Sequence, residues 1–291
     1  MDNVLLAVFG GLPLGATYAL IALGLVLVYR TTGTFNLAHG QLMLLGAFVL
    51  ASWQQHSRGP FVLGLLIGLA VAGIVAVVLY VLVLKRTVGQ PHWVAFVATL
   101  VLGQLLDAAM SLYFSAPSYV VSIPGMPKGA VAIFGVRVGQ SELIIAGIGV
   151  LLALVFIAAL RYTRLGIQVR AAGQDPVLAS QGGIQVRSLY VGSWVVAGIL
   201  AALAGVLYGS TTVVDSSMSG VALIAIPAMV LGGLDSFEGA VVGGLIVGVI
   251  QGFITVYIGG QYVNAATYSF LLVLLLVLPR GLFGTKEVVK I

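Results

Sequence analysis

The sequence predicts an all-α, polytopic integral membrane bundle with about eight or nine membrane crossings. Hydrophobic residues make up 60% of the 291 positions and charged residues only 7%, whereas an ordinary soluble domain has about 25% charged residues. Apolar segments recur from Leu5 to Leu278 with only short interruptions, which leaves little room for a soluble domain. We therefore expect residues 1–291 to form a single transmembrane domain.

A membrane-spanning helix needs about 20 apolar residues, and a helix satisfies its own backbone hydrogen bonds inside the bilayer. We recognise no strand of alternating polarity. Two apolar segments, His39 to Trp53 and Val221 to Leu231, are shorter than a full span, and transporters often interrupt helices in this way near a substrate site. Seven segments have the full length: Leu5 to Tyr29, Phe61 to Leu84, Val94 to Tyr113, Leu143 to Leu160, Leu189 to Thr211, Gly239 to Tyr257 and Val263 to Leu278. The first of them follows Asp2 and exceeds a signal-peptide core, so we expect it to be retained.

Basic residues between the apolar segments orient the chain, because cytoplasmic loops carry an excess of Lys and Arg. This places the loop from Ser115 to Gln140 outside and requires Val214 to Leu231 to cross as a broken helix. Nine crossings result, with an extracytoplasmic N-terminus and a cytoplasmic C-terminus, or eight if His39 to Trp53 is re-entrant. The clusters that we place in the cytoplasm are Lys85 and Arg86; Arg161, Arg164, Arg170 and Arg187; and Arg280, Lys286 and Lys290.

Glycines recur at spacings of four residues, which puts small residues on single helix faces and lets helices approach closely in lipid. The pairs Gly64 and Gly68, and Gly205 and Gly209, follow this spacing, as do Gly244, Gly248 and Gly252. We expect most of these faces to be tightly packed.

Several kinds of chemistry are not expected. The chain has no cysteine, and its three histidines, His39, His56 and His92, lack the i, i+4 spacing of a helical metal site. It has neither a Gly-Lys dipeptide, as a Walker A phosphate loop requires, nor a G-x-S-x-G nucleophile elbow. We therefore expect no metal, no cofactor and no catalytic residue, and any energy that the protein uses must come from elsewhere than ATP hydrolysis by this chain. The basic residues are interspersed among apolar spans, so no nucleic-acid partner is expected.

Asp107 is the only acidic residue well inside a clear span. Because an ionisable group in the membrane is costly and usually functional, Asp107 can serve a proton relay or bind a substrate amine. The alternative is an interhelical hydrogen bond, for which Gln104 and Ser111, three and four residues away on the same helix face, are candidate partners.

The longest hydrophilic interval runs from Arg161 to Arg187, and the orientation above makes it cytoplasmic. Asp175 followed by Pro176 is a strong helix start, and Gly182 with Gly183 can end the helix. The pattern predicts a short helix from Pro176 to Gln181 that lies across the membrane surface, with a merely solvated loop as the alternative.

Four motifs in order resemble one family, the permease subunits of branched-chain amino acid importers of the ATP-binding-cassette type, and specifically the first of the two related permeases. The motifs are GLPLGATYALIALGLVLVYRTTGTFNLAHGQLMLLGAF (Gly11 to Phe48), the loop Arg170 to Ile184, VLGGLDSFEGAVVGGLIVG (Val230 to Gly248) and LPRGLFG (Leu278 to Gly284). The resemblance covers almost the whole chain.

The resemblance implies a bacterial-type inner-membrane importer with a second homologous permease, two cytoplasmic ATPase subunits and an extracytoplasmic solute-binding protein, surrounded by lipid. The short helix would then be the coupling helix: Asp175 would cap it, Leu178 would fill an apolar pocket of the ATPase, and Arg170 and Arg187 would pair with acids there. The full set of expected coupling residues is Arg170, Gln174, Asp175, Pro176, Leu178, Gln181 and Arg187.

Asn36 is expected to cap the helix that follows it, and Gly40 to permit close approach of a neighbour. His39 either hydrogen-bonds a backbone carbonyl or lies along the substrate path, facing the partner permease. The candidates for the substrate path are Asn36, His39, Gln41, Gln104 and Asp107.

Three alternatives remain at this stage. Relatives of this type also carry urea, amides or other small organic solutes. A carrier driven by protons through Asp107 is a second possibility. A membrane enzyme is disfavoured by the lack of paired acids, metal ligands and nucleophile–base pairs.

Overall fold

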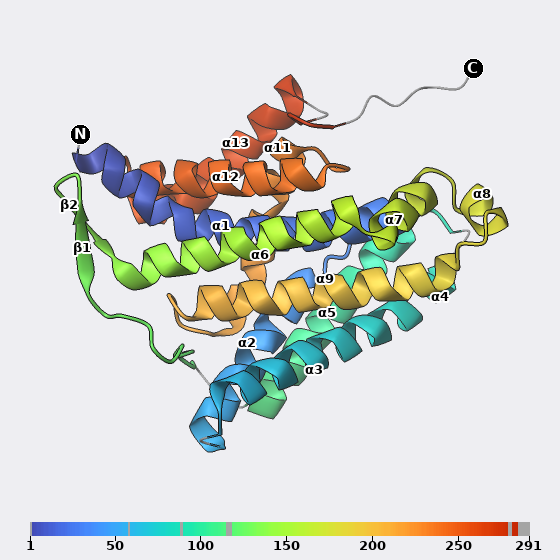
Figure 1. The fold of residues 1–291 in the computed structure, drawn as a ribbon, viewed down its shortest axis with the longest axis horizontal. Helices are drawn as coiled ribbons and strands as arrows, with labels where there is room; N and C mark the ends of the chain where they lie inside the picture. Colours follow the sequence, from blue (N-terminus) through green and yellow to red (C-terminus); the bar gives the residue numbers. More distant parts are fainter. Residues whose placement is uncertain (1, 58, 88–89, 115–117, 279–280, 285–291) are drawn as a thin grey trace. The chain divides into compact units, whose positions relative to one another are not determined.

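The computed structural model describes residues 2–57, 59–87, 90–114, 118–278 and 281–284. Arg280, Lys286 and Lys290 of the third basic cluster lie outside the described residues, as does Ser115 at the start of the predicted outer loop. The described chain is almost wholly helical (Figure 1). Its elements are α1 (Asp2–Thr32), α2 (His39–His56), α3 (Phe61–Leu82), α4 (Leu84–Thr87), α5 (His92–Phe114), β1 (Ala130–Ile133), β2 (Val136–Gly139), α6 (Gln140–Tyr162), α7 (Arg164–Gln174), α8 (Pro176–Gln181), α9 (Val186–Gly209), the 3-10 helix η1 (Ser216–Gly220), α10 (Val221–Ile224), α11 (Ile226–Gly232), α12 (Phe237–Tyr257), the 3-10 helix η2 (Gly260–Tyr262) and α13 (Val263–Val277).

The predicted membrane spans are confirmed. In the described part of the chain, seven helical segments are long and apolar enough to cross a membrane, and they coincide with the seven full-length predicted segments. The two short predicted segments correspond to α2, of 18 residues, and to Ser216–Gly232. The latter is broken into η1, α10 and α11 as predicted, and Pro227 lies in the first turn of α11, where a missing N–H is tolerated. The chain is therefore a multi-pass membrane protein.

The chain divides into two compact units. One contains Met1–Val26, Pro127–Ile157 and Ile224–Ile291, and the other contains Leu27–Met126 and Ala158–Leu223. The border between the units falls inside α1 and α6, and again at the end of α10.

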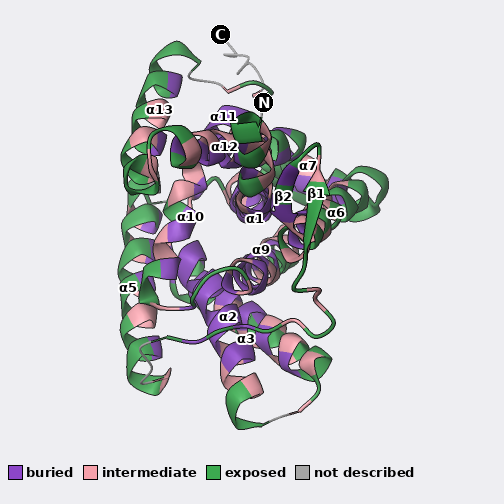
Figure 2. Ribbon diagram, turned by 90° about the vertical axis from the view of Figure 1, so that its left-hand side faces the viewer, coloured by how far each residue is buried: buried purple, intermediate pink, exposed green. Residues whose placement is uncertain are grey.

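Helices α2, α3 and α9 pack against one another in the second unit (Figure 1), and glycines make this packing close. A Cβ at Gly46 would overlap Ala202, and one at Gly205 would overlap the carbonyl oxygen of Met43. A Cβ at Gly68 would lie 3.1 Å from the carbonyl oxygen of Gly46. Figure 2 shows α2 buried along most of its length, whereas much of α5 is exposed. Helix α2 is thus the core of this unit.

A second glycine-lined contact joins α12 to the first part of α1 in the other unit. A Cβ at Gly248 would overlap the backbone of Gly15, and one at Gly252 would overlap the carbonyl oxygen of Ala7. A Cβ at Gly244 would lie 2.7 Å from the Cα of Ala19. The tight packing expected from the four-residue glycine spacing is therefore present here, as close backbone contact requires.

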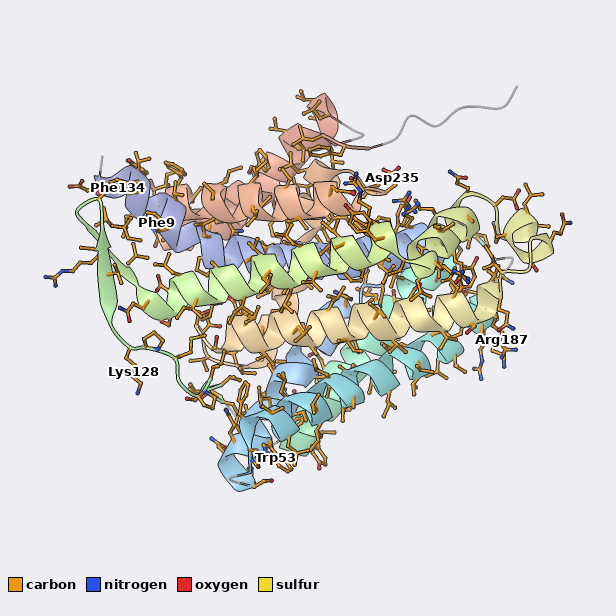
Figure 3. The ribbon with its side chains drawn as sticks, in the orientation of Figure 1. Phe9, Trp53, Lys128, Phe134, Arg187 and Asp235 are labelled. Carbon is orange, nitrogen blue, oxygen red and sulfur yellow. The ribbon has the colours of Figure 1, made fainter. Side chains whose placement is uncertain are left out.

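The predicted all-α fold is confirmed, with one short addition that the sequence analysis did not recognise: β1 and β2 form an antiparallel hairpin within the predicted outer loop. Phe134 and Gly135 connect the strands with φ of 49° and 87°, the two positive values that a tight two-residue hairpin turn needs. Figure 3 shows Phe134 at the hairpin tip, and its side chain is exposed. In β2 the buried Val136 and Val138 alternate with the exposed Arg137, but a strand of four residues is too short to stand out by alternation.

Candidate functional site

A turn from Asn36 to Ala38 leads into α2, and it differs from the predicted cap. The N-cap residue of α2 is Ala38, and no side chain caps the helix. The Oδ1 atom of Asn36 instead accepts a hydrogen bond from the Ala38 N–H at 3.1 Å, so Asn36 stabilises the turn before the helix rather than the helix itself. The prediction that Asn36 caps α2 is wrong because the helix begins later than the local pattern suggests.

Gly40 brings the start of α2 into direct contact with the broken segment η1–α10. A Cβ at Gly40 would overlap the carbonyl oxygen of Ser219 and would lie 3.1 Å from the Cβ of Ala222. The close approach expected of Gly40 is therefore present. It brings the first turn of α2 and the 3-10 turn of η1 to one place in the second unit.

Asp107 joins these two elements to α5. Its Oδ2 atom accepts a hydrogen bond from Gln41 Nε2 at 3.0 Å. Ser219 Oγ lies 3.2 Å from the same oxygen and shares its one proton between Asp107 and the carbonyl oxygen of Ser216 at 2.9 Å. The predicted interhelical hydrogen bond of Asp107 is therefore present, but its partners lie on α2 and η1. The suggested partners Gln104 and Ser111 are both exposed and form neither of these bonds, so that part of the prediction is wrong. Gln104 lies on the exposed part of α5 and is not brought into the site.

We call Asn36, His39, Gln41, Asp107 and Ser219 the polar cluster. It contains several buried polar atoms without a hydrogen-bond partner, namely Asn36 Nδ2, His39 Nδ1 and Nε2, Gln41 Oε1 and Asp107 Oδ1. Buried polar groups in proteins are nearly always paired, so each exception needs an explanation. The backbone-carbonyl bond expected of His39 is absent, although its side chain is only 1% exposed. The cluster thus holds unpaired donors and acceptors that a small polar ligand can satisfy.

Thr99 and Ser219 were missed by the sequence analysis. Thr99 Oγ1 accepts a hydrogen bond from the Leu37 N–H at 3.2 Å. Its one proton can go to the carbonyl oxygen of Phe96 at 2.9 Å or to that of Phe35 at 3.3 Å. Thr99 lies two turns before Asp107 on α5, with Gly103 between them. A Cβ at Gly103 would lie 3.0 Å from Gln41 Oε1, so a larger residue there would crowd the Gln41 amide. The four-residue spacing of Thr99, Gly103 and Asp107 was the signal in the sequence.

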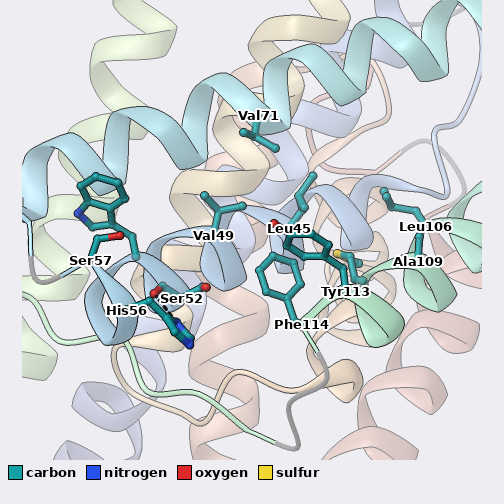
Figure 4. Close-up of a pocket in the computed structure, with 12 residues that line it drawn as sticks. Leu45, Val49, Ser52, His56, Ser57, Val71, Leu106, Ala109, Tyr113 and Phe114 are labelled. Carbon is teal, nitrogen blue, oxygen red and sulfur yellow. Dashed lines mark hydrogen bonds between the residues drawn. The ribbon is translucent and has the colours of Figure 1, made fainter.

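An apolar cavity of about 480 Å³ lies between α2, α3 and α5 and is open to the surface, since Tyr113 on its wall is 82% exposed. No residue of the polar cluster lines it, but Leu45 and Leu106 on its wall follow Gln41 by four residues and precede Asp107 by one. Figure 4 shows Leu45 and Val49 of α2, Val71 of α3 and Leu106 and Ala109 of α5 around it. The few polar groups on its wall belong to the last turns of α2, where the His56 Nδ1 atom lies 3.0 Å from the carbonyl oxygen of Ser52. No pattern in the sequence predicts this cavity.

A second candidate site is the elbow, which we define as α7 and α8 with the glycines that follow. The predicted helix from Pro176 to Gln181 is confirmed, and Asp175 Oδ1 caps it by accepting from the N–H groups of Val177 and Leu178 at 2.9 and 3.0 Å. Gly183 follows with φ of 86°, the left-handed conformation that commonly ends a helix. Val177 and Leu178 are 64% and 62% exposed, so α8 presents an apolar pair on its surface.

The elbow contacts the last turns of α1 and α6, which are the parts of these two helices that belong to the second unit. Arg170 Nη1 donates to the carbonyl oxygen of Leu160 at 3.2 Å, and a Cβ at Gly166 would overlap the same oxygen. A Cβ at Gly173 would lie 2.5 Å from the carbonyl oxygen of Arg30. Helix α7 of the elbow is thus in direct contact with the ends of α1 and α6.

The remaining predicted elbow residues are exposed. They are Gln174, Pro176, Gln181 and Arg187, and Figure 3 shows Arg187 at the start of α9. Across the described residues, no group of three or more His, Asp or Glu side chains is arranged to hold a metal ion.

Comparison with known proteins gives one consistent family. Residues 7–279 match the family model described as "Branched-chain amino acid transport system / permease component". The high-affinity branched-chain amino acid transport system permease protein LivH of Escherichia coli is 30% identical over 97% of this chain and 96% of its own length. The ribose import permease protein RbsC of Escherichia coli is also 30% identical, over 81% of this chain and 72% of its own length. A chain of PsaBC from Streptococcus pneumoniae, solved in complex with Fab, has the same fold, with a TM-score of 0.51, 13% identity and coverage of 93% of this chain and 91% of that chain.

Proposed function

This chain belongs to the family of branched-chain amino acid transport system permease components, and we propose that, with a second homologous permease, it forms the translocation pathway of an ATP-driven importer for branched-chain and other small hydrophobic amino acids. The chain is the membrane subunit. Two cytoplasmic ATPase subunits supply the energy, and an extracytoplasmic binding protein delivers the solute.

The elbow is the observation that carries this proposal. Its exposed pair Val177 and Leu178 stands on a short helix that Asp175 stabilises locally, and an exposed apolar pair on a rigid element suits an anchor for a partner protein. The contacts of Arg170, Gly166 and Gly173 link that anchor to the ends of the membrane helices. A motor protein seated on α8 can therefore transmit force into the membrane part of this chain.

The orientation follows from charge. Basic residues lie in α4 and at both ends of the elbow, at Arg161 and Arg187, and such residues favour the cytoplasmic side. We therefore assign the elbow to the cytoplasm, the N-terminus to the outside and the C-terminus to the cytoplasm of a bacterial-type inner membrane. Gln174, Gln181 and the two arginines Arg170 and Arg187 then surround the apolar pair with polar groups at the edge of the motor contact.

The test is ATP-dependent uptake of labelled leucine into proteoliposomes that contain this chain with its permease partner, the ATPases and the binding protein. Asp175→Ala removes the cap of α8 and is expected to lower uptake several-fold while ATP hydrolysis continues, because the motor then acts on a frayed helix. A cap is typically worth about 1 kcal/mol.

Ser236→Ala is the matched control, because Ser236 Oγ caps α12 by accepting from the Gly239 N–H at 2.9 Å. It removes a cap of the same kind outside the elbow and is expected to leave the ratio of uptake to ATP hydrolysis unchanged. Leucine uptake that continues without any ATPase subunit would contradict the proposed function. Normal coupling in Asp175→Ala would show that α8 is not the coupling element.

A further inference from the structure

We propose that the polar cluster and the apolar cavity together bind one hydrophobic α-amino acid inside this subunit. Gln41 and Asp107 accept hydrogen bonds from its ammonium group, the start of α2 receives its carboxylate, and the cavity takes its aliphatic side chain. This inference rests on the proposed function, because it names the part of this chain that recognises the transported solute.

The ammonium position follows from the unpaired acceptors. Asp107 carries its carboxyl group within an apolar span, and both of its hydrogen-bond donors, Gln41 Nε2 and Ser219 Oγ, are neutral and reach the same atom, Oδ2. Asp107 Oδ1 and Gln41 Oε1 are buried and have no partner. Within the described part of the chain, no cationic side chain bonds to Asp107. A carboxylate in the membrane needs a positive partner, and an ammonium group supplies both the charge and the N–H donors for the two bare oxygens.

The carboxylate position follows from the unpaired donors. Asn36 Nδ2 lacks a partner, and so do both ring nitrogens of His39, one of which is a donor in the neutral imidazole. Both side chains are only 1% exposed. They lie at the start of α2, a helix of 18 residues without a side-chain cap. The N-terminus of a helix attracts negative charge, and broken helices in transporters bind substrate carboxylates in this way. Donors and acceptors for both charged ends of an amino acid are thus gathered between Asn36 and Gln41 and at Asp107.

The cavity continues from the polar cluster in the direction that a side chain requires. Leu45 follows Gln41 by four residues, a rise of about 6 Å along α2. Met110 follows Asp107 by three residues on the same face of α5, and both Leu45 and Met110 line the cavity. The volume of about 480 Å³ is within the usual range of about 300–1,000 Å³ for small-molecule sites. A ligand with its charged end at Gln41 therefore places an aliphatic side chain among Leu45, Leu106 and Met110.

This arrangement discriminates against uncharged polar solutes. A sugar or urea in the site would leave Asp107 without a positive partner. It would also bring its hydroxyl or amide groups against the apolar wall. A ligand that leaves buried polar groups unpaired is strongly disfavoured. The site therefore selects hydrophobic amino acids over the sugar named for one relative of this chain.

Direct binding to the purified permease assembly without the binding protein tests the inference. Thermal unfolding is measured in nanodiscs with L-leucine, with 4-methylpentanoate, which lacks the ammonium group, with 3-methylbutylamine, which lacks the carboxylate, and with ribose. A ligand that binds the folded state raises the unfolding temperature. We expect a rise with leucine only, and Asp107→Asn, which keeps the shape of the side chain, is expected to weaken leucine binding at least tenfold.

A matched pair on α5 tests the cavity independently of the charge. Both Ala108 and Ala109 are exposed, but only Ala109 lines the cavity. Ala109→Leu is expected to weaken leucine binding severalfold more than alanine binding, because it fills space that only the larger ligand needs, and Ala108→Leu is expected to change neither. Because these variants keep Asp107, the test remains decisive even if Asp107→Asn does not fold.

The outcomes separate the inference from the proposed function. Equal stabilisation by leucine in the wild type and in Asp107→Asn, or by leucine and 4-methylpentanoate, would overturn the inference. Normal ATP-driven leucine uptake by Asp107→Asn and Ala109→Leu would also overturn it while the proposed function stands. Absence of ATP-driven uptake by the complete wild-type assembly would instead contradict the proposed function.

Discussion

Two buried polar networks, one in each unit, are each centred on a glutamine, and they differ in how completely they are hydrogen-bonded. In the first, Tyr18 Oη donates to Gln251 Oε1 at 2.8 Å, Gln251 Nε2 donates to Thr267 Oγ1 at 2.9 Å, and that hydroxyl donates to the carbonyl oxygen of Val263 at 2.7 Å. In the second, Gln41 bonds to Asp107 through Nε2, while its Oε1 has no partner.

The two glutamines are almost equally buried, with exposed fractions of 2% for Gln251 and 6% for Gln41. Burial therefore does not distinguish them. A network with every member paired stabilises the packing of the helices that it joins, whereas one with bare donors and acceptors has capacity for a ligand. The comparison teaches that unpaired atoms, rather than buried polar residues as such, mark the candidate site in this chain.

The largest effect is expected where the polar cluster has no spare space. Gly40→Val would push a branched side chain into the backbone of Ser219, and because protein interiors are close-packed, the broken segment would have to move. We expect no monodisperse folded protein in detergent extracts. Gly192→Val is the control, since nothing lies within 4 Å of a Cβ at that position. A Gly40→Val protein with the wild-type unfolding temperature would show that the two elements do not meet as described.

The fully paired network is expected to matter for stability alone. Gln251→Leu leaves the Tyr18 hydroxyl without its acceptor and Thr267 without its donor, and leaving buried partners unpaired costs about 1–3 kcal/mol. Thermal unfolding in detergent should therefore occur at a lower temperature, while leucine uptake per folded molecule stays unchanged. A loss of uptake without loss of stability would show that this network belongs to the pathway.

The same substitution in the other network is expected to give the opposite pattern. Gln41→Leu removes a single hydrogen bond, that from Nε2 to Asp107, and one bond contributes about 0.5–1.5 kcal/mol. The substitution also removes Gln41 Oε1, but this atom has no hydrogen-bond partner, so no further bond is lost. We expect a smaller drop in the unfolding temperature than for Gln251→Leu, together with a decrease in leucine uptake of about tenfold, which corresponds to roughly 1.4 kcal/mol. The comparison fails if the two variants lose stability and uptake in the same proportion.

Much of the fold could be predicted because its determinants are local. Span length and hydropathy depend on consecutive residues, and the cap of α8 depends on Asp175 and the two residues after Pro176, so the sequence indicated both. The partners of Asp107 could not be predicted in the same way. Gln41 lies 66 residues before it and Ser219 lies 112 residues after it, and only the folded chain brings them together.

The misassigned details have a related cause. The residues from Asn36 to Gly40 suggested that Asn36 caps the helix. In the structure, however, the helix starts only at His39, and its second residue, Gly40, contacts Ser219. The cavity between α2, α3 and α5 depends on side-chain packing, which no periodicity encodes. The elbow was found because its structure is local, whereas the polar cluster was only half found because its structure is not.

The smallest expected effect comes from removing one hydroxyl group from each network. Tyr18→Phe takes a donor from Gln251 Oε1, and Ser219→Ala takes a donor from Asp107 Oδ2. Each loses one hydrogen bond, so each unfolding free energy should fall by about 0.5–1.5 kcal/mol. Leucine uptake should nevertheless remain normal in Tyr18→Phe. In Ser219→Ala it should fall two- to threefold, because the lost hydroxyl group helps to fix the carboxyl group that receives the ammonium. This decrease in uptake corresponds to about 0.5 kcal/mol. Paired measurements of uptake per folded molecule and of unfolding temperature check this difference, and equal uptake in the two variants would remove the functional distinction between the networks.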